Sequence, residues 1–97
     1  MKPRRRAPAW YVYMIECAGN RIYTGVTTDV AERFRKHCSG RGAAFTRINP
    51  PVRVLARKRC GTRSAALKAE YALKQRPRPE KLAWARQWRY PHRKAKP

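Results

Sequence analysis

Between residues 11 and 37, side chains that could bind a phosphate and move a proton occur at an informative spacing. Two short segments carry phenols, Tyr11-Val12-Tyr13 and Tyr23-Thr24-Gly25, and a guanidinium and an imidazole follow at Arg33 and His37. Residues two apart on a strand share a face, and residues four apart on a helix stack on one side. If the phenols lie on paired strands and the other two on the next helix, the four polar groups converge. Such a set could bind a nucleic-acid phosphate and assist its hydrolysis.

Each member of this set also has an ordinary structural explanation. Aromatic residues are common in strands, so packing alone would explain a pair of tyrosines. Arg33 would be unremarkable as a solvated surface charge, and His37 near a helix C-terminus is favourable through the helix dipole alone. The order and spacing of the set are therefore more informative than any single residue in it.

A β-hairpin is predicted to position the phenols. Trp10 to Cys17 is aromatic and β-branched and indicates a strand, and Arg21 to Val26 indicates its partner across the turn Ala18-Gly19-Asn20. If that turn is tight, Tyr23 lies near Tyr13 across the ladder.

A helix is predicted to follow the hairpin at once. Residues 27–29 offer capping oxygens, and Glu32 lies three residues after Asp29, which completes a capping box. We expect this helix to run to about Ser39 and to stop at Gly40. Residues 40–51, with two glycines and two prolines, are predicted to form a loop.

The remaining elements follow from alternation and from helix-boundary residues. Val52 to Cys60 alternates and predicts a third strand, with Val52, Val54 and Ala56 on one face. A second helix is predicted to reach about Gln75, with a cap at one of two candidates, Thr62 or Ser64.

Two prolines separate the second helix from a short last one. Pro77 and Pro79 end the preceding helix, and Pro79 suits the first turn of a helix through roughly Trp88. We therefore expect one α+β domain over residues 10–88, in the order strand, strand, helix, strand, helix, helix. Residues 1–9 are predicted to be a disordered basic arm and residues 89–97 a loose basic tail.

The charge balance of the 97-residue chain is lopsided. Its 25 lysines and arginines give a formal net charge of +20, against only five carboxylates, Glu16, Asp29, Glu32, Glu70 and Glu80. Such an excess favours a polyanionic partner that releases counterions on binding. An anionic membrane surface is the rival explanation, but no segment combines a basic face with a broad apolar one. Nucleic acid is the predicted partner, with no membrane association.

The cysteines indicate the compartment. Cys17, Cys38 and Cys60 are odd in number and have no CxxC spacing, which argues against both a disulfide framework and a zinc site. No apolar stretch is long enough to span a bilayer, and the basic N-terminus lacks the apolar run of a signal peptide. These features predict a cytoplasmic protein with reduced thiols.

Glu70 is the carboxylate whose position invites a functional explanation. On the second predicted helix, Ala66, Leu67, Tyr71 and Leu73 surround it at helical spacings, so it lies on or beside the stripe that faces the sheet. A half-buried carboxylate is costly unless it is paired or bound to a cation. An exposed ion pair with Lys74, four residues on, is an equally good explanation.

The order of these elements resembles the GIY-YIG nuclease domain. Tyr-Val-Tyr, a short turn, Tyr-Thr-Gly, Arg33, His37 one turn later and Glu70 on the next long helix follow the pattern of that family. The resemblance covers about Trp10 to Trp84 and is greatest to the small single-domain bacterial branch. The run from Gly40 to Arg47 and the segment Ala69-Glu70-Tyr71 also resemble that branch.

The resemblance implies a small three-stranded antiparallel sheet flanked by helices, and hydrolysis of phosphodiester bonds at one divalent cation, Mg²⁺ or Mn²⁺. By matching position, Tyr13 and Tyr23 are the motif tyrosines, Arg33 binds the phosphate, His37 assists, and Glu70 holds the metal. Tyr13 is predicted to activate the attacking water and Tyr23 to orient it, because cations favour the phenolate form of a tyrosine. The scattered carboxylates are poorly suited to a two-metal site.

Nucleic-acid contacts are predicted at four further residues, Arg41, Thr46, Arg47 and Lys74. Binding is expected to depend weakly on sequence and strongly on salt, because phosphate contacts would dominate it. We expect DNA rather than RNA as the substrate, selected by structure or weakly by sequence.

Some positions depart from the family pattern. The first motif begins with Tyr11 instead of glycine and the second has Thr24 instead of isoleucine, as is familiar in this branch. Val26 stands where some active members have a basic residue. Other members have an asparagine after the metal-binding glutamate, whereas both asparagines here, Asn20 and Asn49, precede Glu70. The alternative is a noncatalytic binder of DNA or RNA, in which Trp84, Trp88 and Tyr90 could stack on bases.

Overall fold

The structure is a computed structural model that describes residues 7–91. In chain order its elements are β1 (Trp10–Cys17), the 3₁₀ turn η1 (Ala18–Asn20), β2 (Arg21–Thr27), α1 (Val30–Cys38), α2 (Ala44–Ile48), β3 (Pro51–Gly61), α3 (Arg63–Lys74) and α4 (Arg78–Gln87). The predicted α+β class and the three-stranded antiparallel sheet are confirmed. Most of the expected basic arm, residues 1–6, and residues 92–97 of the expected tail lie outside the described part.

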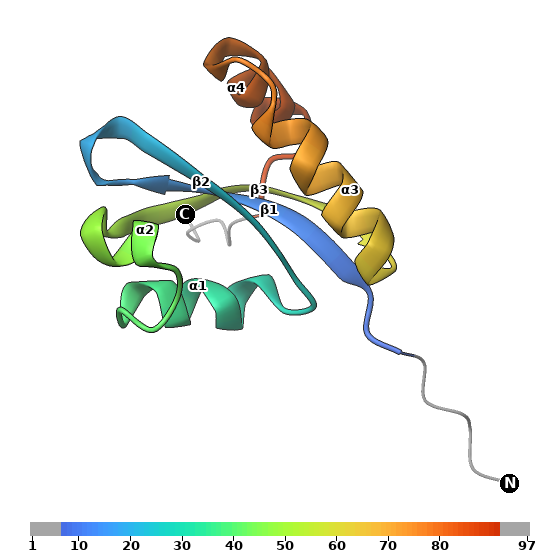
Figure 1. Ribbon diagram of the computed structural model, residues 1–97, viewed down its shortest axis with the longest axis horizontal. Coiled ribbons are helices and arrows are strands. Elements are labelled where there is room, and N and C mark those ends of the chain that lie inside the picture. Colours follow the sequence, from blue (N-terminus) through green and yellow to red (C-terminus); the bar gives the residue numbers. More distant parts are fainter. Residues whose placement is uncertain (1–6, 92–97) are drawn as a thin grey trace, which may run out of the picture.

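The sheet has the order β2-β1-β3, so that β1 is central and β2 and β3 are the two edges (Figure 1). The hairpin between β1 and β2 closes as predicted, through η1. Gly19 and Asn20 adopt left-handed φ values of 73° and 60° there, which glycine and asparagine tolerate best.

Helices cover both faces of the sheet, with α1 and α2 on one side and α3 and α4 on the other (Figure 1). The buried residues divide accordingly, because alternate residues of β1 point to opposite faces. The α1-side core consists of Tyr13, Ile15, Cys17, Val30 and Val54. The α3-side core consists of Val12, Met14, Ala56, Leu73 and Ala85.

The third strand does not alternate as predicted. Val54 belongs to the α1-side core and Ala56 to the α3-side core, although both were expected on one face. The pairing with β1 shifts between Met14 and Ile15, which face Ala56 and Val54 respectively, so Leu55 is an extra residue in a β-bulge. Val52 is exposed.

Helix α1 begins at the predicted cap but without the full capping box. The Asp29 carboxylate accepts a hydrogen bond from the Glu32 amide at 3.0 Å. The Glu32 carboxylate does not return a bond to Asp29; it pairs instead with Arg35 at 2.8 Å. The prediction of a full capping box, with hydrogen bonds in both directions between Asp29 and Glu32, is therefore wrong.

The segment predicted as a loop over residues 40–51 contains a helix. Helix α2, five residues long, lies within it, so residues 7–91 contain four α-helices where three were expected. One turn of helix has no amphipathic period to recognise, and the glycines and prolines around it indicate a loop.

The boundaries of the last two helices agree with the predictions. Thr62, not Ser64, caps α3, accepting a hydrogen bond from the Ala65 amide at 3.1 Å. Pro79 lies in the first turn of α4, as expected.

The chain after α4 returns to β3. The Arg57 amide donates to the Trp88 carbonyl and the Tyr90 amide to the Leu55 carbonyl, each at 3.0 Å. Arg89 and Ala56 thereby form an isolated antiparallel β-bridge. The start of the expected loose tail is thus fixed along the edge strand.

Among the described residues, no helix is long and apolar enough to cross a membrane.

Candidate active site

Tyr13 is the centre of the candidate site. It lies on the central strand β1 and points toward α1, and its side chain is only 1% exposed. Its hydroxyl lies 2.8 Å from Nε2 of His37, a residue of α1 that is equally buried. The predicted convergence of the first motif with the helix is therefore a direct hydrogen bond.

The glycine of the second motif makes room for this tyrosine. Gly25 lies opposite Tyr13 in the ladder between β1 and β2. A Cβ at Gly25 would come within 2.6 Å of the Tyr13 hydroxyl oxygen, closer than any packed contact allows. The phenol thus lies against the bare backbone of the edge strand, a role for Gly25 that reasoning from the sequence missed.

Tyr23 lies diagonally from Tyr13 and not directly across from it. Its partner in the ladder is Ile15, and the ring centroids of the two tyrosines are 6.3 Å apart. Tyr23 is closer to the imidazole of His37, at 4.9 Å between centroids, and also contacts Phe45 of α2 at 5.9 Å. The two phenols therefore flank the same histidine.

Thr46 holds the other side of the imidazole. Its hydroxyl lies 2.7 Å from Nδ1 of His37 and 3.0 Å from the Ala43 carbonyl. Because the carbonyl can only accept, the Thr46 hydroxyl donates to it and accepts from Nδ1–H. Nε2 then carries no proton and accepts the hydrogen bond from Tyr13. The Ala43 amide also points at Nδ1, but from 3.5 Å, whereas Thr46 lies at 2.7 Å. We therefore assign the proton to Nδ1 from the shorter contact, which gives a chain of hydrogen bonds from Tyr13 through His37 to Thr46.

A second glycine allows the turn before α2 to approach this histidine. A Cβ at Gly42 would overlap Nδ1 of His37. The close approach brings the Ala43 carbonyl and Thr46 into place. The sequence around Gly42 indicates only a loop, so this close approach could not be expected from it.

The environment keeps both hydrogen-bonded side chains neutral at neutral pH. Burial, with a smaller contribution from the Arg33 charge, lowers the pKa of His37 to about 4. Burial also raises the pKa of Tyr13 above its ordinary value, and Tyr23 and Glu70 add to the increase. His37 can therefore accept a hydrogen bond at Nε2. A stabilising effect of the helix dipole on a charged His37 does not explain its position, because the ring is neutral.

Arg33 acts on Tyr13 in the direction predicted, but burial outweighs it. As a hydrogen-bond donor and as a positive charge, its half-buried guanidinium lowers the pKa of the Tyr13 phenol. The net pKa shift is nevertheless upward, so the expectation that cations hold Tyr13 as phenolate is wrong for the protein by itself. Arg33 lies close enough to influence both Tyr13 and His37.

Glu70 lies on α3, the helix on the opposite face of the sheet from α1. Its side chain is 20% exposed, and its carboxylate lies 3.4 Å from Nζ of Lys74, which is half exposed. The expected ion pair with Lys74 therefore forms, and the carboxylate is also largely covered, as expected for a residue beside the sheet-facing stripe of the helix. Its negative charge contributes to the raised pKa of Tyr13, so the two side chains are within electrostatic reach of each other.

The four predicted nucleic-acid contacts differ in accessibility. Arg41, Arg47 and Lys74 are exposed. Thr46 is 1% exposed and cannot meet a phosphate, so its prediction as a nucleic-acid contact is wrong. Its hydroxyl serves His37 instead.

The donor set around Glu70 suits one hard cation and no more. The described residues hold no group of three or more His, Cys, Asp or Glu side chains that could bind a metal together. Mg²⁺ prefers oxygen ligands and keeps several waters, so one carboxylate plus substrate phosphate is a set it accepts. Glu70 would have to exchange its contact with Lys74 for the cation.

A buried phenol hydrogen-bonded to a neutral imidazole, with an arginine close enough to act on both, forms the candidate site, and Glu70 reaches it only through its charge from α3. Residues 9–83 match the family described as the GIY-YIG catalytic domain. The chain therefore belongs to the GIY-YIG family, a family of nucleases, and the resemblance expected from its motifs is confirmed.

Similar proteins come from several bacteria. A UPF0213 protein of Cupriavidus necator is 52% identical over 79 residues, covering 81% of this chain and 86% of that protein. A UPF0213 protein of Xanthomonas campestris pv. campestris is 45% identical over 75 residues, covering 77% of this chain and 74% of its own length. The solution NMR structure of a UPF0213 protein from Bacillus halodurans is 38% identical, with a TM-score of 0.52, over 81% of this chain and 84% of that one.

Proposed function

We propose that the protein is an endonuclease that hydrolyses phosphodiester bonds of DNA with one divalent cation, Mg²⁺ or Mn²⁺. The observation that carries this proposal is the hydrogen bond from Tyr13 to His37, beside Arg33 and within reach of the Glu70 charge. Phosphate binding alone would gain nothing from a partly buried carboxylate.

Tyr13 is the proposed general base. The phenol is neutral at rest, so its oxygen can take a proton from the attacking water only as its own proton leaves. Nε2 of His37, which already accepts that hydrogen bond, is the acceptor at hand. Tyr23, against the other side of the imidazole, orients the water.

Arg33 and Glu70 act on the substrate phosphate. The Arg33 guanidinium binds it and stabilises the charge that develops in the transition state. Glu70 would hold the cation, which would supply positive charge to the phosphate and the leaving oxygen. The bound phosphate in turn places a negative charge near His37, which offsets the cost of a proton on that buried ring.

Binding by this protein is proposed to rely on phosphates more than on bases. The formal charge of +20 and the exposed Arg41, Arg47 and Lys74 would supply contacts without sequence information. Selection would then follow the structure of the DNA. The described cysteines are free, as reduced thiols in the cytoplasm would be.

A cleavage assay tests this function. Linear, nicked, branched and single-stranded DNA, with matching RNA, would be incubated with the protein in Mg²⁺, Mn²⁺ or chelator. We expect products from at least one DNA substrate with metal and none with chelator. Tight binding of every substrate without cleavage of any would favour a noncatalytic nucleic-acid-binding protein instead.

A further inference from the structure

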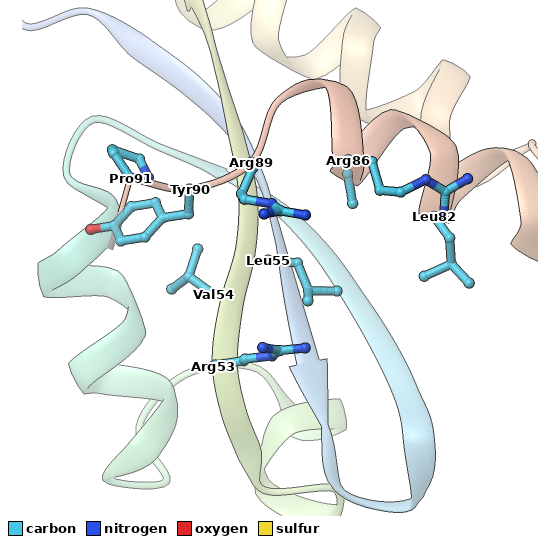
Figure 2. Close-up of a pocket in the computed structure, with 9 residues that line it drawn as sticks. Arg53, Val54, Leu55, Leu82, Arg86, Arg89, Tyr90 and Pro91 are labelled. Atoms are coloured by element: carbon cyan, nitrogen blue, oxygen red, sulfur yellow. The ribbon is translucent and has the colours of Figure 1, made fainter. Parts of the chain in front are cut away.

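An open groove with a volume of about 650 Å³ lies at the β3 edge, where α4 and the segment after it pack against the strand (Figure 2). Apolar side chains of Val54, Leu55, Leu82 and Ala85 contribute to its lining. Three arginines surround them, Arg53, Arg86 and Arg89. Figure 2 shows the guanidinium groups of Arg53 and Arg89 reaching the same way past Leu55, with Arg86 opposite on α4.

The backbone around this groove is well anchored. Arg89 is held between two hydrogen bonds to β3, made by the Trp88 carbonyl and the Tyr90 amide. Nε of Arg53 donates to the Glu16 carboxylate at 2.7 Å, which restrains its guanidinium. An arginine restrained in this way loses less side-chain freedom when it binds a ligand.

The groove continues into a second hollow toward the hairpin turn. This hollow has a volume of about 240 Å³ and shares Arg53, Leu55 and Leu82 with the first. It adds Arg78 and the carboxylate of Glu16, which is already paired with Arg53. Together the hollows are lined by four arginines and one carboxylate, and we call this continuous surface the arginine groove. Its excess of positive charge fits an extended polyanion.

The arginine groove runs from the β3 edge under α4 to the hairpin turn, where Asn20 and Ile22 also line it, whereas Tyr13 belongs to the α1-side core on the other face of the sheet. The Tyr13 hydroxyl lies against Gly25 of β2, whereas Arg53 and Leu55 belong to β3, on the other side of β1. A phosphate held by Arg33 is therefore not the phosphate that these arginines could hold.

We propose that the arginine groove binds the sugar–phosphate backbone of a nucleic acid, away from the stretch that enters the candidate active site. Planar guanidinium groups match phosphate oxygens in pairs, and the apolar floor suits sugars. An acidic peptide would carry backbone donors and acceptors, and the groove offers mainly guanidinium and hydrocarbon to meet them. This proposal shares with the proposed function only the identity of the ligand.

The test is a binding measurement on the full chain. Arg86→Glu with Arg89→Glu reverses two exposed charges of the groove, and Lys68→Glu with Arg76→Glu makes the same charge change at exposed residues outside it. Binding of a DNA duplex would be followed by fluorescence anisotropy over a range of salt concentrations. We expect the groove variant to bind roughly tenfold or more weakly than the control, with a salt slope lower by about 2.

Equal losses in the two variants would overturn the proposal, because the effect would then come from net charge alone. A groove variant that keeps its DNA affinity but loses binding to polyglutamate would also overturn it, in favour of an acidic protein partner. Circular dichroism of both variants checks that they are folded. Cleavage by the groove variant at saturating DNA reports on the proposed function separately, so either idea can fail while the other stands.

Discussion

The Tyr13 hydroxyl donates a 2.8 Å hydrogen bond to Nε2 of His37 across 24 residues of sequence. This bond joins the central strand to the first helix inside the α1-side core. It is directional because Thr46 occupies the opposite nitrogen, Nδ1, at 2.7 Å. The phenol oxygen fixed in this way donates its proton to His37 and also lies within hydrogen-bond reach of the Arg33 guanidinium.

Removing the Tyr13 hydroxyl should abolish most of the proposed activity. Tyr13→Phe leaves the ring in place, and we expect cleavage to fall by at least about a hundredfold, in the range that a positioned general base contributes. The control is Tyr11→Phe, on the same strand, whose ring lies beneath Arg57 and not against His37. Single-turnover cleavage of DNA by the two variants measures the difference. Equal rates in Tyr13→Phe and Tyr11→Phe would remove Tyr13 from the mechanism.

Adding one methyl group at Gly25 should disturb the site through Tyr13. Gly25→Ala pushes on the phenol oxygen, and overpacking of this kind costs about 1–3 kcal/mol in the free energy of unfolding. We expect activity to fall as well, even at temperatures where the variant is folded. The control is Gly61→Ala, where the φ of +86° makes a side chain costly but the added Cβ meets no atom within 4 Å. Urea unfolding and cleavage together would show stability lost in both variants and activity lost only in Gly25→Ala.

The Thr46 hydroxyl should matter through the tautomer of His37. Thr46→Val keeps the shape but leaves Nδ1–H without an acceptor, which costs about 1–3 kcal/mol of stability and releases the ring to the other tautomer. Thr46→Ser restores the hydroxyl and should restore both the tautomer and the cleavage rate. Nitrogen NMR shifts of the imidazole report the tautomer directly. A valine variant with an unchanged tautomer would contradict this role for Thr46.

Stability should decrease in mild acid because of His37. Its pKa is about 4 in the folded protein and about 6.5 in an unfolded chain, so between these values the unfolded chain binds more protons. The free energy of unfolding should therefore fall as pH drops from about 6.5 toward 4, by on the order of 3 kcal/mol for this group. His37→Gln should lack this part of the decline, which urea unfolding at several pH values can measure. Parallel pH profiles of the two proteins would contradict the assignment of a buried neutral histidine.

The elements of this fold are readable in the sequence because their local signals are unambiguous. The aromatic and β-branched run of β1, the Gly19-Asn20 turn and Pro79 in the first turn of α4 each favour one local structure by themselves. The motifs likewise place Tyr13 and His37 on facing elements. These are properties of short segments, and tertiary packing did not override them.

The details that the sequence did not predict depend on tertiary contacts. The bulge at Leu55 sends Val54 and Ala56 to opposite faces, and no alternation pattern shows an inserted residue. The burial of Thr46 depends on a single helical turn folding over His37, in a segment with the composition of a loop. Similarly, the requirement for glycine at position 25 arises from a phenol on the neighbouring strand.

The most direct test of the proposed nuclease is the removal of the Glu70 charge. Glu70→Gln keeps the size of the side chain, and Glu80→Gln makes the same change at an exposed residue of α4. Single-turnover cleavage of DNA in Mg²⁺ would be measured for both variants, with binding measured in chelator. We predict at least about a hundredfold slower cleavage for Glu70→Gln with its DNA affinity kept, and no change for Glu80→Gln. Cleavage by Glu70→Gln at the rate of the unmodified protein would contradict the account.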